Sequence, residues 1–99
     1  MQSVKTKGKL WLHSGDKASW VFLTLDDQAA KKMNEAKESR KKRTGWGQVS
    51  VTVKLGKSNW KTSVFPDKKR GWILPVKADV RKKNNISEGD IVIATLSWI

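Results

Sequence analysis

The amino-acid sequence predicts a single, mainly β domain with two helices. Its 99 residues are the length of one domain with one core. Val49, Val51, Val53 and Leu55 alternate with polar residues, and this period of two is typical of a half-buried strand. Several other short apolar runs are separated by turn residues, one segment has the three- and four-residue spacing of an amphipathic helix, and a second, short helix is expected around Val80.

The first two strands are expected to form a hairpin. They comprise residues 7–13 and 19–25, and the Ser-Gly-Asp sequence of residues 14–16 favours a turn between them. The second strand is apolar on both faces. This indicates either burial on both sides or an aromatic side chain that is exposed for use.

A helix is predicted to follow the hairpin. Asp26 or Asp27 is a suitable N-cap. The small apolar stripe that follows, which can lie against a sheet, consists of Ala29, Ala30, Met33 and either Ala36 or Lys37. From residue 37 to residue 43 the pattern gives way to a charged run, which predicts a frayed helix end and then a mobile basic loop.

Four more strands and a short helix are predicted from residue 48 onwards. The strands are residues 48–55, 59–65, 72–74 and 91–99. The last of them is rich in Ile and Val, and it is expected to be central and largely buried. The short helix covers residues 78–84, with Val80 as its buried anchor.

The predicted elements give the order strand, strand, helix, strand, and then the same order again. This is a pseudo-symmetric ββαβ repeat within one domain over residues 1–99. The first half covers about residues 7–55 and the second about 58–99.

Composition argues against an enzyme. The chain has no Cys and one His, His13, so thiolate and imidazole metal sites, cysteine nucleophiles and histidine-based triads have no support. The aspartates at 16, 67, 79 and 90 lie near expected turns or caps, where Asp serves the backbone. We therefore predict no catalytic residue, no metal site and no cofactor.

The charge is the strongest compositional feature. The formal net charge is +12, and such a field attracts phosphate polyanions. The alternative is that the lysines serve solubility alone. The N-terminal residues contain no apolar run long enough for a signal peptide or a membrane span, so a cytoplasmic protein without a membrane partner is expected.

Two resemblances bear on the fold. The second half resembles the swapped-hairpin proteins typified by AbrB and MazE, through its Leu-Pro at 74–75, Val-Arg at 80–81 and Gly-Asp at 89–90. The whole chain is similar to a small prokaryotic family catalogued as a domain of unknown function and found beside YdeI-like bacteriocin-protection proteins. The matching segments are residues 20–22, 45–47, 60–69, 74–77, 80–81 and 89–90.

These resemblances imply a double-split β-barrel, with both halves in one chain. A monomer is therefore expected, and a homodimer is the alternative. The AbrB relatives bind DNA as dimers, often with an Arg after the Gly that opens the strand. Here that position is Trp72, and an indole cannot neutralise a phosphate as Arg can.

The first functional hypothesis is binding of DNA or RNA through basic loops. Two basic runs precede Gly-Trp, and an indole beside a cation can stack on an unpaired base. Trp46 and Trp72 are open between core packing and base stacking, whereas Trp20 and Trp60 are expected in the core. The candidate residues are Arg40, Lys41, Lys42, Arg43, Trp46, Lys68, Lys69, Arg70, Trp72 and Arg81.

The alternative hypothesis is a module without catalytic activity that binds a small anionic ligand or a protein partner in a groove between the two halves. Its candidates combine an aromatic wall with donors for a carboxylate or phosphate. They are Trp60, Lys61, Thr62, Ser63 and Lys77. The structural alternative is that these are ordinary strand residues, with Lys61 on a wet face.

Overall fold

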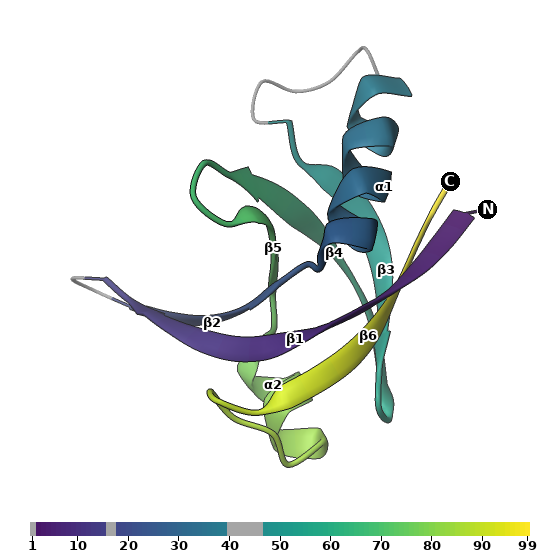
Figure 1. Ribbon diagram of the computed structural model, residues 1–99. Helices are drawn as coiled ribbons and strands as arrows, with labels where there is room; N and C mark the ends of the chain where they lie inside the picture. Colours follow the sequence, from purple (N-terminus) through teal and green to yellow (C-terminus); the bar gives the residue numbers. More distant parts are fainter. Residues whose placement is uncertain (1, 16–17, 40–46) are drawn as a thin grey trace.

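Six antiparallel strands close into a barrel in the computed structural model, which describes residues 2–15, 18–39 and 47–99. The elements are β1 (Gln2–Ser14), β2 (Ser19–Thr24), α1 (Asp27–Ser39), β3 (Val49–Leu55), β4 (Ser58–Asp67), β5 (Gly71–Pro75), α2 (Ala78–Lys83) and β6 (Ile91–Trp98). Around the barrel the strand order is β1-β2-β5-β4-β3-β6. The two helices lie at opposite ends of the barrel, and the chain termini lie side by side (Figure 1).

The predicted mainly β class with two helices is confirmed, as is the order of the elements. One boundary differs substantially, because β1 begins at Gln2 and not at residue 7. The alternation of apolar and polar residues is interrupted at Thr6, which is polar although its side chain is buried. Its hydroxyl oxygen accepts a hydrogen bond from the Asp26 backbone N–H at 2.9 Å. The inward position is thus filled by a polar side chain that has a partner.

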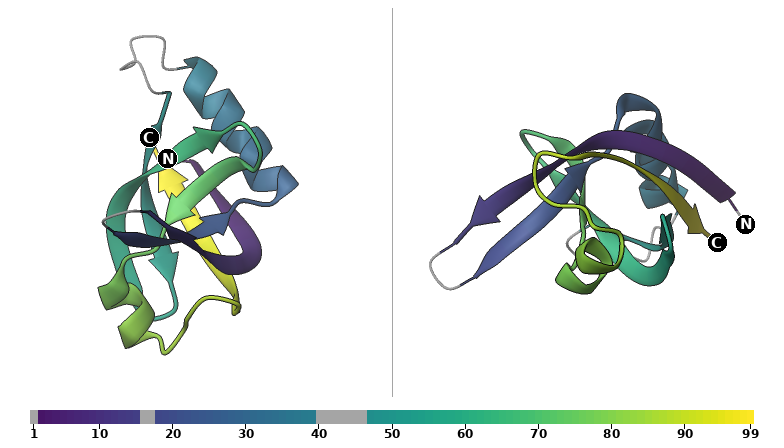
Figure 2. Two further views of the ribbon diagram at one scale, coloured as in Figure 1. Left: turned by 90° about the vertical axis from the view of Figure 1, so that its left-hand side faces the viewer. Right: turned by 90° about the horizontal axis from the view of Figure 1, so that it is seen from below.

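β1 is long because it pairs with two different strands. Residues 2–9 pair with β6, and residues 10–14 pair with β2. Gly8 lies where the strand changes partner, and a Cβ there would lie 2.9 Å from the Thr24 carbonyl oxygen. A glycine therefore permits the close approach of β1 to the end of β2. In Figure 2 the β1–β2 hairpin projects beyond the barrel.

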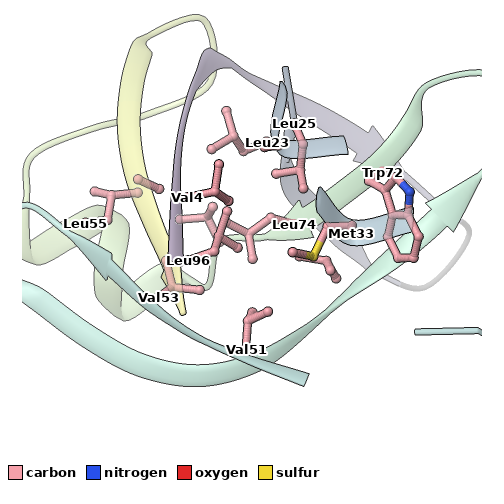
Figure 3. Close-up of a cluster of buried hydrophobic side chains, with 14 of the residues drawn as sticks. Val4, Leu23, Leu25, Met33, Val51, Val53, Leu55, Trp72, Leu74 and Leu96 are labelled. Atoms are coloured by element: carbon pink, nitrogen blue, oxygen red, sulfur yellow. The ribbon is translucent and has the colours of Figure 1, made fainter. Parts of the chain in front are cut away.

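The core fills the inside of the barrel and the face of α1 that covers it (Figure 3). The expected stripe of α1 is confirmed, with Ala29, Met33 and Ala36 buried. The Asp26 carboxylate caps the helix by accepting a hydrogen bond from the Ala29 backbone N–H at 3.0 Å. β3 alternates strictly between buried and exposed residues, as predicted.

The expectation for β6 was wrong. Its inward residues Val92, Ala94, Leu96 and Trp98 are buried, but Ile91 and Ile93 are 63% and 57% exposed. β6 is central in the sense that it pairs with β1 on one edge and β3 on the other. A barrel nevertheless covers only one face of each strand, so an apolar run does not require burial on both faces.

No helix in the described part of the chain is both long and apolar enough to cross a lipid bilayer.

Candidate nucleic-acid interface

The outward residues of the β1–β2 hairpin form an aromatic face, which we define as Trp11, His13, Trp20 and Phe22. The strand register places Trp11 opposite Phe22 and His13 opposite Trp20. Side chains alternate along each strand, so the residues between them point to the inner face. The four rings therefore gather on one side of the hairpin.

The rings of the aromatic face contact one another. Trp20 and Phe22 are nearly parallel, with an interplanar angle of 14° and centroids 6.3 Å apart. Trp11 lies 5.1 Å from Phe22, and its indole Nε1–H donates a hydrogen bond to Thr24 Oγ1 at 2.9 Å. Trp11 and Phe22 are half-buried, whereas Trp20 is 55% exposed. Trp11 and Phe22 are thus held against the barrel, and the indole of Trp20 extends into solvent.

A basic turn lies against the aromatic face. Arg70, between β4 and β5, places its guanidinium carbon 3.9 Å from the centroid of the Trp11 ring, which is a cation–π contact. Lys68 and Lys69 precede it in the same turn and are exposed. The Asp67 carboxylate accepts a hydrogen bond from the Lys69 backbone N–H at 3.0 Å, which orders the turn.

A row of lysines leads along β1 to the aromatic face. Lys5, Lys7 and Lys9 alternate with inward residues, so they share the outer side of the strand with Trp11. All three are exposed, and successive ones are about 6.7 Å apart along a strand. We call these three residues the lysine row. In Figure 1 the strand that carries both features is one continuous ribbon from the N-terminus to the hairpin.

No ion pair to these cations is found among the side chains of the described residues. Between the side chains of residues that the structure describes, the one ion pair is Lys32–Glu35 at 3.9 Å, on α1. The Asp26 carboxylate lies near the lysine row, but it accepts a hydrogen bond from the backbone N–H of Lys7 at 3.2 Å. The positive charge of the face is thus available to a polyanion.

A groove lies beside the aromatic face, where β5 ends. In the described strand pairings, β5 joins residues 22–24 of β2 to residues 65–67 of β4, and no strand joins the two further on. The space between them is a groove of about 400 Å³. The lining residues that matter here are Trp20, Trp60, Lys61, Thr62, Lys77 and Arg81.

Helix α2 is fixed beneath this groove. The Arg81 Nε–H donates a hydrogen bond to the Val76 carbonyl oxygen at 3.1 Å. The Asn84 amide, just after the helix, donates to Ser58 Oγ at 3.0 Å and to the Val80 carbonyl oxygen at 2.9 Å. Its oxygen accepts a hydrogen bond from the Lys57 backbone N–H at 2.7 Å. α2 is therefore tied to the start of β4, which forms one wall of the groove.

The residues proposed for nucleic-acid binding are not brought together as expected. Trp72 is 3% exposed, and its indole Nε1–H donates a hydrogen bond to Asn34 Oδ1 at 2.8 Å, so it is a core residue that cannot stack on a base. Figure 3 shows it at the end of the core cluster, on the side of Met33. Arg81 lies in the groove. Lys68, Lys69 and Arg70 lie in the basic turn, and the other five candidates, Arg40, Lys41, Lys42, Arg43 and Trp46, lie outside the described residues.

The residues proposed for a small ligand are mostly brought together. Trp60, Lys61, Thr62 and Lys77 all line the groove, and Trp60 also packs against the core. Ser63 is not among the residues that line the groove; it lines a separate depression together with Lys61, Thr62 and Ser97.

The aromatic face itself was missed. Trp20 is expected in the core from the sequence, and His13 enters the sequence analysis only as a residue without the partners of a metal site or a triad. The sequence signals are the turn predicted at residues 14–16 and the alternation of side chains along the two strands beside it; the strand register then places Trp11 opposite Phe22. Local sequence does not say which side of the hairpin meets the core, because the inner side is chosen by β5 and β6.

Comparison with known proteins places the chain in a family. No curated protein matches it. The model of a family described as a domain of unknown function, DUF1905, matches residues 7–96. That stretch contains the aromatic face, the basic turn and the groove. The chain therefore belongs to the DUF1905 family of domains of unknown function.

Proposed function

We propose that the protein binds single-stranded nucleic acid along the outer side of β1 and β2. The observation that carries this proposal is Trp20, which is 55% exposed and stacked against Phe22 beside a basic turn. A large apolar ring is costly to leave in water, and it commonly marks a binding surface when cations surround it. Every base has a flat face that can stack on such a ring.

The geometry favours a single strand over a duplex. Bases in a duplex are stacked on each other, so an indole on a sheet surface has no base face to contact. The lysine row adds phosphate contacts along the same side of β1, and Arg70 adds a guanidinium at the aromatic face. Stacking and phosphate contacts thus follow one path along the strand.

The path differs from that of the AbrB relatives that the second half resembles. Their DNA contact often uses an Arg after the Gly that opens the strand, and Trp72 at this position is buried here. The proposed path instead uses the first hairpin. We infer that any kinship with AbrB-like or YdeI-associated proteins is one of fold and not of binding surface.

The test is a titration of a fluorescently labelled single-stranded oligothymidine at low salt, followed by anisotropy. Trp20→Ala should weaken binding about 5- to 150-fold, the usual loss for one base stacked on an aromatic ring. Leu12→Ala is the matched control, because Leu12 is 42% exposed on the opposite face of the same hairpin. Equal affinity of Trp20→Ala and wild type for the single strand contradicts the proposal. Tighter binding of a duplex of the same length than of the single strand also contradicts it.

A second candidate function is binding of a small anionic ligand in the groove. The observation that favours it is the presence of Lys61, Lys77 and Arg81 around one cavity with two indoles. A protein partner is less well matched, because a stable protein interface covers about 800 Å² on each side and this groove is small. Isothermal titration with inorganic phosphate and with aromatic carboxylates tests this candidate; no heat with either sinks it.

We also propose the finer architecture of a pseudo-symmetric, double-split barrel. If β1, β2 and β3 are exchanged with β4, β5 and β6, respectively, strands that are neighbours around the barrel become strands that are also neighbours. This order supports two equivalent halves. A chain that supplies both halves has no need of a partner, so we expect a monomer. We also propose that the protein is cytoplasmic and binds its ligand without catalysis. Light scattering that shows a dimer at low concentration argues against this.

A further inference from the structure

We infer that the groove binds a nucleotide that carries a terminal phosphate, with its base on the indoles of Trp20 and Trp60. This inference rests on the proposed function for one source of the nucleotide, the end of a bound strand. The other source is a free mononucleotide. Both present the same chemistry to the groove, namely a flat base and a phosphate group.

The charges of the groove match a terminal phosphate. Lys61, Lys77 and Arg81 line it, and no carboxylate is among the described residues that form its walls. A terminal phosphate monoester carries about −1.5 to −2 charges at neutral pH, whereas a phosphate inside a strand carries a single one. Three cations around one cavity therefore favour the end of a strand over its interior.

The Arg81 side chain is pre-oriented for a contact with the phosphate. Its side chain is half-buried, and its Nε–H is already engaged with the Val76 carbonyl oxygen at 3.1 Å. This bond directs the guanidinium and leaves its two terminal NH₂ groups for a ligand. An Arg held in this way can bind two phosphate oxygens at once, which a lysine cannot.

Trp20 joins the groove to the aromatic face. It stacks on Phe22 outside the barrel, and it also lines the groove together with Trp60. A strand whose bases stack on the aromatic face thus reaches the groove at Trp20. The groove volume of about 400 Å³ is in the range of small-ligand pockets, so it suits one terminal nucleotide and not a longer segment.

The experiment compares three oligothymidines of equal length, with a 5′-phosphate, with a 3′-phosphate and with both ends as hydroxyls. We expect one phosphorylated form to bind about tenfold more tightly than the hydroxyl form, as one additional charge-assisted contact allows. Lys77→Ala combined with Arg81→Ala should abolish this advantage. Lys61→Ala alone should reduce it without touching α2. Lys82→Ala, an exposed lysine on α2, is the control that keeps it.

Each outcome separates the two proposals. Equal binding of all three oligonucleotides overturns the groove inference and leaves the proposed function standing. An advantage that survives in both groove variants overturns the assignment of the phosphate to this groove. Binding of thymidine monophosphate without binding of any oligonucleotide overturns the proposed function and supports the groove with a free nucleotide as its source. Inorganic phosphate that competes as well as thymidine monophosphate overturns the contact between base and indoles.

Discussion

Replacement of the lysine row tests whether nucleic acid follows β1. In the triple variant Lys5→Ala, Lys7→Ala, Lys9→Ala, three exposed cations are lost from one side of the strand. Each phosphate neutralised on a single strand contributes about 0.7 to the slope of log affinity against log salt, so the slope should become shallower by about 2. Between about 50 and 200 mM salt, the wild type should then lose about 20-fold more affinity than the variant.

The assay is the anisotropy titration with single-stranded oligothymidine, repeated at several salt concentrations. The matched control replaces Lys57, Lys82 and Lys83, which are exposed at the α2 end of the barrel. This replacement removes the same net charge as the lysine-row variant. Thermal unfolding should differ little among the three proteins, because exposed substitutions usually change stability by less than about 0.5 kcal/mol. If the slope of log affinity against log salt becomes as shallow in the control as in the lysine-row variant, only the overall charge attracts the nucleic acid. The proposed path along β1 is then refuted.

Three further predictions concern stability, each measured by urea unfolding. Asn84→Ala should lower the free energy of unfolding by about 1–3 kcal/mol, because the buried Ser58 hydroxyl loses the hydrogen bond from the Asn84 amide, whereas exposed Asn59→Ala should have little effect. Gly8→Ala should cost about 1–3 kcal/mol by overpacking, since the added Cβ meets the Thr24 carbonyl oxygen at 2.9 Å; an unchanged midpoint contradicts the close approach of β1 and β2. Asp26→Ala should cost about 0.5–2 kcal/mol through loss of the helix cap, and Asp26→Asn, which keeps one acceptor oxygen for the Ala29 N–H but none for the Lys7 N–H, should recover part of this loss. Equal losses in the two Asp26 variants argue against capping.

Elements whose evidence is local were predicted well. Of the two N-cap candidates Asp26 and Asp27, the structure selects Asp26, and the stripe through Met33, the anchor at Val80 and the alternation of β3 are confirmed. Each depends on the geometry of a helix turn or a strand pleat, which a few neighbouring residues set by themselves. The hairpin of β1 and β2 belongs to the same class, because its turn residues and its period of two are both local.

Burial of the aromatic residues was not predictable in this way. Trp20 and Trp72 are both tryptophans in short apolar strands, yet one is 55% exposed and the other 3%. Trp72 faces α1, where Asn34 accepts its N–H, and Trp20 faces solvent at the projecting hairpin. Ile91 and Ile93 differ from Val92 for the same reason, since only one side of each strand meets the core.

The sequence by itself determined the kinds of element, their order, an aspartate N-cap for α1 and the strong positive charge, because these follow from local geometry and composition. Only the tertiary structure decided which side of each strand is inner, since that choice depends on closure between β1 and β6, which lie at opposite ends of the chain. β5 pairs with β2 and β4 only as far as Pro75, and the groove lies between β2 and β4 beyond it. Trp20, Trp60 and Arg81 come from three separate elements, and long-range strand pairing alone brings them to one cavity.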